Sequence, residues 1–349
     1  MRAAVLFTLL MLLSPLATLI PPANDSELDF PESQDSASTR ALIIWSGTVD
    51  IPNDFTVAAG DELRIYAGTI VQLGPGVRVY IEGKIVAQGT QIDPITVQVE
   101  PGYIWHDGFQ FNATSRNRGS SLRNMTFSDA QFGITIYNSD PVLEDILFDN
   151  VDLVAIDMFD SANPIIRRVN FHEGGKDVHG AMTHWRYGIG LSVGASSAPF
   201  VEDVTFFNQT TRAISYWGGS GGVIRHVNIS DVGGATMNIS AGIFVEDSFP
   251  LIEHINISKC DNGIYVLHRT DNVTTRPVFK NTVIGDSQYT GVMLTKVDRF
   301  NYSVYMMARF HNLEVFGTGG VNASTPGLAF GTIFLNTSGG WFEDVNIHD

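Results

Sequence analysis

The chain has 349 residues, of which 44% are hydrophobic and 17% charged, and its formal net charge at pH 7 is −16. Recognition of nucleic-acid phosphates needs clustered Lys and Arg side chains, so this acidic balance argues against a nucleic-acid partner. The only cysteine, Cys260, excludes an intrachain disulfide. Its place among repeated apolar positions predicts an inert, buried side chain.

The first 23 residues predict a targeting segment. Arg2 precedes an apolar run over residues 3–13, and small residues follow at Ala17 and Ala23. This is the pattern of a secretory signal peptide. An uncleaved N-terminal anchor is the alternative, because the apolar stretch is nearly long enough to span a bilayer. Both interpretations predict a secreted protein or one on the extracellular cell surface, with membrane contact only through this segment.

Residues 24–40 predict a disordered tether, because they are acidic, Ser-rich and poor in large apolar side chains. From residue 41 to residue 349 the composition changes to hydrophobic and Gly-rich sequence. This part is long enough to bury a large core, and we expect it to form one continuous domain.

A short phrase recurs through residues 41–349. It reads Arg-Asn-Met-Thr-Phe-Ser-Asp at 123–129 and Glu-Asp-Ile-Leu-Phe-Asp-Asn at 144–150, and further copies begin at 167, 202, 225, 253, 280, 312 and 343. Apolar and polar residues alternate, which is strand periodicity. The side chains expected to point inward are Met125, Phe127, Ile146, Phe148, Val169, Phe171, Val204, Phe206, Val227, Ile229, Ile255 and Ile257.

A second short strand follows each phrase and begins with Gly or Ala before an aliphatic residue, as in Gly133-Ile134 and Gly190-Leu191. The period is about 21–28 residues, with one coil stretched between Pro164 and Pro199. Short strands at a fixed period, without helical stretches, predict a solenoid of stacked coils. The predicted fold class is all-β, a right-handed parallel β-helix.

The early repeats carry a family resemblance. Residues 68–90, Asp-Pro-Ile-Thr-Val at 93–97 and Trp-His-Asp-Gly-Phe-Gln-Phe at 105–111 resemble secreted right-handed parallel β-helix repeat proteins. The architecture of that group is similar to that of pectate lyases and NosD-like periplasmic proteins. The resemblance covers residues 41–349. It implies the fold, whereas the activity stays open because such helices carry many different functions.

Asp or Asn residues end most phrases: Asp129, Asn150, Asn208, Asp231, Asp286 and Asp349. Both residue types tolerate left-handed backbone and bond to their own turns. We therefore expect a structural ladder of corners and no acidic binding site.

Alignment of the second strands gives one outward column of Thr135, Asp157, Ser192, Ser215, Phe244, Tyr265 and Met293. Two residues later a second column contains Tyr137, Phe159, Gly194, Trp217, Glu246, Leu267 and Thr295. The alignment predicts a carbohydrate-binding face of five exposed aromatics, Tyr137, Phe159, Trp217, Phe244 and Tyr265, with Asp157 and Glu246 facing sugar hydroxyls. The alternative is a cross-coil aromatic stack that only stabilises the fold.

The long coil holds an insertion at residues 172–187 that is rich in titratable groups. A polysaccharide lyase needs a base and carboxylates that hold Ca²⁺. Lys176, His179, His184 and Arg186 are the candidates for the base, and Asp177 or Asp157 for the cation ligand. A glycoside hydrolase needs paired carboxylates, for which Asp157, Asp160, Glu246 and Asp247 are available. A merely solvated loop is the alternative. No cofactor or metal site is predicted, except Ca²⁺ under the lyase hypothesis.

Eleven Asn-x-Ser/Thr sequons predict surface glycosylation. The alternative for some of them is that the recurring phrase happens to contain Asn-Ile-Ser. They lie at Asn24, Asn112, Asn124, Asn208, Asn228, Asn238, Asn256, Asn272, Asn301, Asn322 and Asn336.

The favoured functional interpretation is a non-enzymatic, glycan-binding or structural surface protein whose partner is a polysaccharide or cell-surface glycan. The alternative is a polysaccharide lyase or glycoside hydrolase that acts on acidic polysaccharide. The last phrase, residues 343–349, stops at a coil corner. Since a solenoid end needs cover, we expect further coils or another subunit beyond Asp349.

Overall fold

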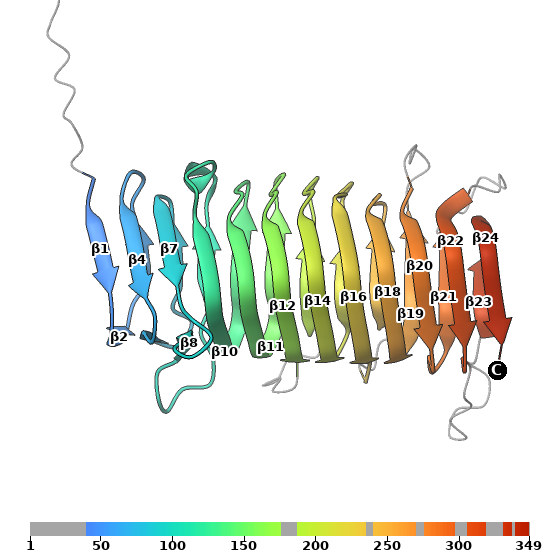
Figure 1. Ribbon diagram of the computed structural model, residues 1–349, viewed down its shortest axis with the longest axis horizontal. Helices are drawn as coiled ribbons and strands as arrows, with labels where there is room; N and C mark the ends of the chain where they lie inside the picture. Colours follow the sequence, from blue (N-terminus) through green and yellow to red (C-terminus); the bar gives the residue numbers. More distant parts are fainter. Residues whose placement is uncertain are drawn as a thin grey trace, which may run out of the picture. The chain divides into compact units, whose positions relative to one another are not determined.

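A computed structural model describes residues 40–175, 187–234, 240–269, 276–296, 306–318, 331–336 and 339–348. These residues belong to one compact unit, Thr39–Asp349. They form a single sheet of 24 strands whose pairings in this part of the chain are parallel. Figure 1 shows the strands stacked along the long axis. Within this part of the chain the only helix is the 3₁₀ turn η1 (Ala113–Ser115). The all-β parallel solenoid predicted from the repeat is confirmed.

The N-terminal coils have three strands each, and the strands stack in three columns. The first column contains β1 (Leu42–Trp45), β4 (Glu62–Tyr66) and β7 (Lys84–Gln88). The second contains β2 (Thr48–Ile51), β5 (Ile70–Leu73) and β8 (Ile95–Val99). The third contains β3 (Phe55–Val57), β6 (Val79–Ile81) and β9 (Phe109–Phe111). We call these columns the first, second and third sides of the solenoid.

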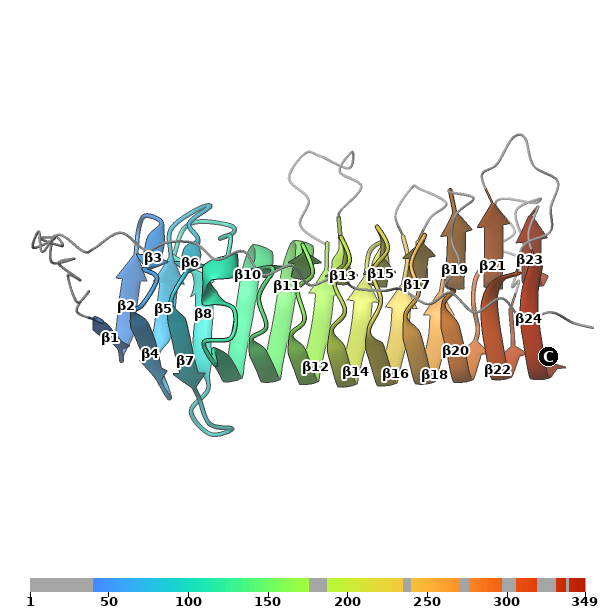
Figure 2. The ribbon, with the colours of Figure 1, turned by 90° about the horizontal axis from the view of Figure 1, so that it is seen from above.

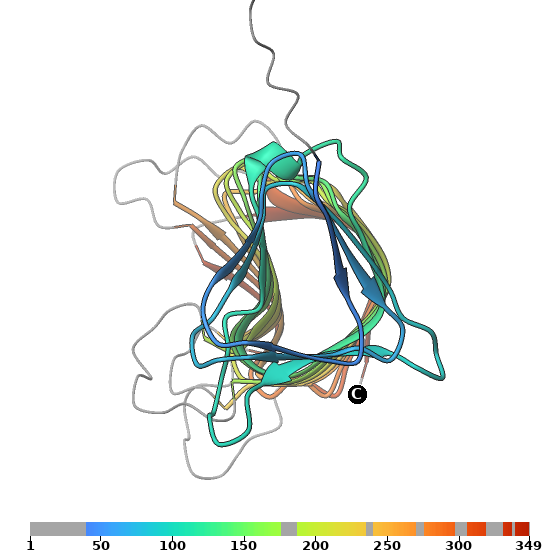
Figure 3. The same ribbon diagram turned by 90° about the vertical axis from the view of Figure 1, so that its left-hand side faces the viewer.

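Two long strands join the three sides. β10 (Ser121–Tyr137) pairs with β7, β8 and β9 in turn, and β11 (Val142–Phe159) stacks on β10. Seen end-on, each coil encloses a central core (Figure 3).

In the later coils one strand covers the first and second sides, and a separate strand forms the third side (Figure 2). The former are β12 (Ile165–Gly174), β14 (Phe200–Gln209), β16 (Val223–Val232), β18 (Leu251–Cys260), β20 (Val278–Gly285), β22 (Met306–Phe316) and β24 (Gly339–His348). The latter are β13 (Ile189–Val193), β15 (Arg212–Tyr216), β17 (Ala241–Glu246), β19 (Asn262–His268), β21 (Thr290–Lys296) and β23 (Gly331–Asn336).

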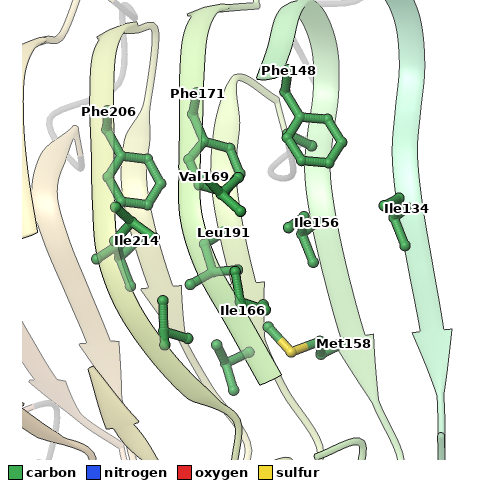
Figure 4. Close-up of a cluster of buried hydrophobic side chains, with 14 of the residues drawn as sticks. Ile134, Phe148, Ile156, Met158, Ile166, Val169, Phe171, Leu191, Phe206 and Ile214 are labelled. Atoms are coloured by element: carbon green, nitrogen blue, oxygen red, sulfur yellow. The ribbon is translucent and has the colours of Figure 1, made fainter. Parts of the chain in front are cut away.

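The core is the row of inward side chains that the repeat predicts. All twelve residues expected to point inward are buried in one hydrophobic cluster. The phenyl rings of Phe148, Phe171 and Phe206 lie one above another (Figure 4), with centroids 5.4 Å and 4.4 Å apart. Cys260 is buried, and burial raises the pKa of its thiol to about 12, so it is an inert filler as predicted.

Glycine near the start of the third-side segments has a packing reason. A Cβ on Gly190 would lie 2.6 Å from a ring carbon of Phe206, and one on Gly133 would lie 2.5 Å from Phe148. The Gly/Ala-aliphatic pattern of the sequence therefore marks the place where the third-side backbone passes directly over the core phenyl rings.

Left-handed residues form the corners. Asp129, Asn150, Asn208, Asp231 and Asp286 all have φ between 53° and 59°, which confirms the structural interpretation; Asp349 lies outside the described residues. An earlier corner in the same phrase, unpredicted, is also left-handed, for example at Asp145 (φ 54°) and His226 (φ 55°). The two corners per phrase bend the strand from the first to the second and from the second to the third side.

The first side carries a column of alternating charge. In register order it contains Arg123, Glu144, Arg167, Glu202, Arg225, Glu253, Lys280, His311 and Glu343. Charge alternates from Arg123 to Lys280, and ion pairs join several neighbours in the column, among them Arg225–Glu202 at 2.6 Å and Lys280–Glu253 at 2.9 Å. Since unlike charges on adjacent strands attract, this column helps to hold the coil register.

Coil length varies more than the period suggests. Val142 and Ile165 are register partners within the predicted range, whereas Val86 pairs with Ser121 and Val278 with Arg309 over longer coils. Among the described residues, no helix is long and apolar enough to span a membrane.

Candidate functional site

The outward surface of the third side contains the predicted binding face. Side chains alternate along a strand, and Ile156 and Met158 of β11 belong to the core (Figure 4). Asp157 between them therefore points outward. The same holds along β13, β15, β17 and β19, and we call this surface the outer face.

A row of short polar side chains runs across the outer face. Thr135, Asp157, Ser192 and Ser215 are register partners on successive coils, and Phe244, Tyr265 and Met293 continue the row. This confirms the alignment made from the sequence. All four polar residues are buried, and Asp157 is only 1% exposed. The outer face thus holds hydroxyls and a carboxylate close to the backbone.

An aromatic row accompanies the polar row. The rings of Tyr137 and Phe159 stack with centroids 5.0 Å apart, and Phe159 meets Trp217 edge-on at 5.7 Å. Gly194 lies between these two in the register, and a Cβ there would come within 2.1 Å of the Trp217 ring. The indole therefore lies over Gly194, and its Nε1–H donates to Ser192 Oγ at 3.3 Å. All three rings are half-buried.

The expectation of five exposed aromatics is wrong for two of them. Phe244 is 2% exposed and Tyr265 is 7% exposed. Their rings meet edge-on at 5.3 Å and form a separate apolar cluster with Ala241 and Leu267. The reason is lateral packing: large side chains on adjacent coils, about 4.8 Å apart, cover one another. The aromatic surface therefore consists of Tyr137, Phe159 and Trp217.

Arg212 is a feature that sequence reasoning missed. Its guanidinium carbon lies 3.7 Å from the centroid of the Phe244 ring, and Nη1 donates to Ser215 Oγ at 3.2 Å. The residue is 7% exposed, and burial lowers its pKa to about 10, although nearby Glu246 opposes that shift. The aligned coils could have indicated it, because Arg212 is a charged residue at a position where the neighbouring coils carry the apolar Ile189 and Ala241.

Two acidic residues lie at the C-terminal end of β17, Glu246 as its last residue and Asp247 directly after it, and each contacts a basic side chain. Glu246 is half-buried and its Oε1 forms an ion pair with Arg269 Nε at 2.5 Å. Asp247 Oδ1 lies 3.2 Å from Nδ1 of the buried His268, a contact that the sequence did not suggest. An aspartate can orient an imidazole for proton transfer, so this pair is one acid–base element near the outer face.

The structure does not bring Asp157 and Glu246 together. Asp157 stands on β11 and Glu246 on β17, three coils further along the solenoid. At about 4.8 Å per coil, their backbones are roughly 14 Å apart along the axis. Paired carboxylates of glycoside hydrolases are separated by about 5–9.5 Å, so these two do not form such a pair.

The loop candidates Lys176, Asp177, His179, His184 and Arg186 lie outside the described residues. Asp157 is thus the one member of the proposed lyase set that the structure describes, whereas the hydrolase candidates Asp160, Glu246 and Asp247 are also described. Among the described residues, one group of three has the spacing of a metal site, Glu202, Asp203 and His226. It lies away from the outer face, and Glu202 and Asp203 already pair with Arg225 and His226.

The sequons differ in their surroundings. Asn228 and Asn256 are exposed and bond to each other at 3.1 Å, whereas Asn124 donates its amide to Gly89 O. Asn112 and Asn208 are half-buried. Asn24, Asn238, Asn272, Asn301 and Asn322 lie outside the described residues, and Asn336 ends β23. Glycosylation stays a prediction.

Comparison with known proteins agrees with the geometry. Residues 107–277 match the family described as the right handed beta helix region. This match agrees with the parallel β-helix fold that the strand register shows. No curated protein sequence matches the chain.

Solved structures share this fold at low sequence identity. The periplasmic alginate epimerase AlgG is 12% identical with a TM-score of 0.55, over 87% of this chain and 78% of that one. An alginate lyase from Paenibacillus sp. str. FPU-7 is 12% identical with a TM-score of 0.47, over 81% and 93%. The catalytic domain of a GH87 α-1,3-glucanase is 12% identical with a TM-score of 0.46, over 86% and 64%.

Proposed function

We propose that this protein is a polysaccharide-active enzyme, of the lyase or glycoside hydrolase class, that binds its glycan along the outer face. The observation that carries the proposal is the aromatic row of Tyr137, Phe159 and Trp217 beside a buried polar row that includes Asp157. A β-helix does not need a carboxylate packed against the outside of its sheet for stability, because removing a charge from water is costly.

The aromatic row suits sugars. An aromatic ring gives the apolar face of a pyranose a flat contact, and neighbouring hydroxyls and carboxylates accept or donate hydrogen bonds at its edge. The three rings follow the axis of the solenoid across successive coils, so they match an extended chain of sugars better than a single compact ligand.

The enzymatic interpretation is favoured over non-enzymatic binding. AlgG, which shares the fold, is named as an alginate epimerase, so this architecture supports polysaccharide chemistry. Asp157 and the Asp247–His268 pair are described groups that can transfer protons on or beside the outer face. The separation of Asp157 from Glu246 speaks against these two as a hydrolase pair.

We further propose an extracytoplasmic location. The N-terminal residues have the pattern of a signal peptide, and AlgG is described as periplasmic. Detection of the processed N-terminus in a culture medium or periplasmic fraction, by mass spectrometry, tests this proposal.

The test of function uses the purified protein and a panel of acidic and neutral polysaccharides. Binding is measured by calorimetry, unsaturated uronate products by ultraviolet absorbance, and new reducing ends by a colorimetric assay. Unsaturated products identify a lyase, and reducing ends without unsaturation identify a hydrolase. Binding without any product would return the protein to the non-enzymatic class.

Trp217→Ala tests the aromatic row. Loss of one sugar-stacking ring should weaken binding about tenfold, equivalent to about 1.4 kcal/mol. Trp341→Ala is the matched control, because Trp341 is an exposed indole on the first side, where it pairs with Arg309. Circular dichroism should be unchanged in both variants. Equal affinities of wild type and Trp217→Ala would contradict a role of this row.

A further inference from the structure

Arg212 is a buried arginine for which the described residues supply no anionic partner. Arg167, Arg168 and Arg225 each form ion pairs with carboxylates on adjacent coils. Arg212 makes one hydrogen bond, to Ser215 Oγ, and within the described part of the chain no carboxylate lies within ion-pair distance of it. Its Nε is buried without a hydrogen-bond partner.

This arrangement is costly in the free protein. Arg212 is buried, so its guanidinium loses hydration, and the face of the Phe244 ring replaces only part of it. Burial lowers the pKa of Arg212 to about 10, which still leaves the group charged at neutral pH. The nearest acidic influence is Glu246, which is itself paired with Arg269.

The guanidinium also lies close to the aromatic row. Arg212 bonds to Ser215 Oγ, and Trp217 bonds to Ser192 Oγ. Ser192 and Ser215 are register partners on adjacent coils, about 4.8 Å apart. The cation and the indole are therefore anchored on neighbouring hydroxyls of one polar row, and a glycan on the aromatic row passes beside the cation.

We propose that Arg212 and Ser215 form an anion subsite that recognises the carboxylate or sulfate group of an acidic sugar in the bound polysaccharide. The inference rests on the proposed function and adds the substrate class. A planar guanidinium suits both anions, because it presents parallel N–H donors to two oxygens. The anion supplies the partner that Arg212 lacks.

The net charge of the protein opposes the binding of acidic glycans, so a preference for them would point to a local site. The chain carries a net charge of −16, so an acidic polysaccharide is repelled at a distance. Tighter binding of an acidic glycan than of its neutral counterpart therefore requires a local attraction that exceeds this repulsion, and the Arg212 guanidinium supplies one.

The experiment compares matched polysaccharides on the wild-type protein. One pair is a polyuronate and its carboxyl-reduced form, and the other is a sulfated polysaccharide and its desulfated form. We expect at least tenfold tighter binding of one anionic member than of its neutral form, and the pair that shows the difference identifies carboxylate or sulfate as the group recognised.

Arg212→Met should abolish that difference. Arg225→Met is the matched control, because it removes a charge and a contact with an aromatic ring from the first side, where Arg225 lies over Phe200. The control should keep the full preference. A folded Arg212→Met variant that keeps the full preference overturns the inference. If Arg212→Met does not fold, Ser215→Ala, which removes the hydroxyl that accepts from Arg212 Nη1, takes its place, and an unchanged preference in that variant overturns the inference equally.

Two further results overturn the inference in distinguishable ways. Equal wild-type affinity for anionic and neutral forms, with weaker binding by Trp217→Ala, refutes the anion subsite and leaves the proposed function standing. Absence of binding to every polysaccharide in the panel refutes both.

Discussion

His106 provides a pH-dependent test of the core. Its side chain is fully buried, with Nε2 3.1 Å from Ser128 O, while Nδ1 accepts from the Gly108 N–H at 3.0 Å. An acceptor at Nδ1 requires the neutral ring with its proton on Nε2. Burial lowers the pKa of His106 to about 4 from an ordinary value of 6.5, against a smaller opposing effect of its backbone hydrogen bonds.

The sign of the effect follows from proton uptake. Below pH 6.5 the unfolded chain binds a proton at this histidine, whereas the folded chain does not until about pH 4. The contribution of the neutral His106 to folding stability is therefore fully present above pH 6.5, and it is lost as the pH decreases toward 4. A shift of about 2.5 units corresponds to about 3 kcal/mol.

The assay is urea unfolding of wild type and His106→Gln at several pH values between about 4 and 7.5. Glutamine keeps a donor for Ser128 O and does not titrate. Other groups, such as Asp107, whose pKa burial raises, contribute equally to both proteins. Wild type should lose about 3 kcal/mol more than the variant across this range. Parallel stability curves would refute the assignment of a buried neutral imidazole.

The remaining predictions concern packing. Phe206→Ala should destabilise the fold by about 3–5 kcal/mol, because the ring is fully buried between coils. Asp231→Ala, at a left-handed corner, should cost about 1 kcal/mol, and equal losses of melting temperature would contradict the two placements. Tyr216→Phe should raise stability by about 1 kcal/mol, because the Tyr216 hydroxyl is buried with no partner among the described residues; a lower melting temperature would contradict this. Gly194→Ala should weaken glycan binding as Trp217→Ala does, because the new Cβ displaces the indole; calorimetry that finds unchanged affinity would show that the indole does not hold the sugar.

Local patterns were sufficient for the fold. Alternation along each phrase determines which side chains face inward, because successive residues of a strand point to opposite sides. All twelve predicted core residues are buried for this reason. The corners were also predictable in part, since Asp and Asn adopt left-handed backbone at low cost. The earlier corner escaped notice because Arg168 and His226 occupy it in some coils.

The outer face was only partly predictable. The sequence alignment placed Thr135, Asp157, Ser192 and Ser215 in one row, and the register agrees. It could not show that Phe244 is covered, because its exposure depends on the neighbouring coils. The alternating charge column of the first side was likewise hidden, since its members stand more than twenty residues apart in the chain.

The amino-acid sequence by itself determined the coil, because strand alternation, glycine over the phenyl rings and left-handed corners are properties of a few adjacent residues. Tertiary structure decided the chemistry of the outer face. The distance between Asp157 and Glu246 depends on how many coils separate the two residues. The presence of a carboxylate beside Arg212 depends on the register of the adjacent coils. Those distances are set by stacking across coils of unequal length, and a shift of one residue would turn every side chain to the opposite face.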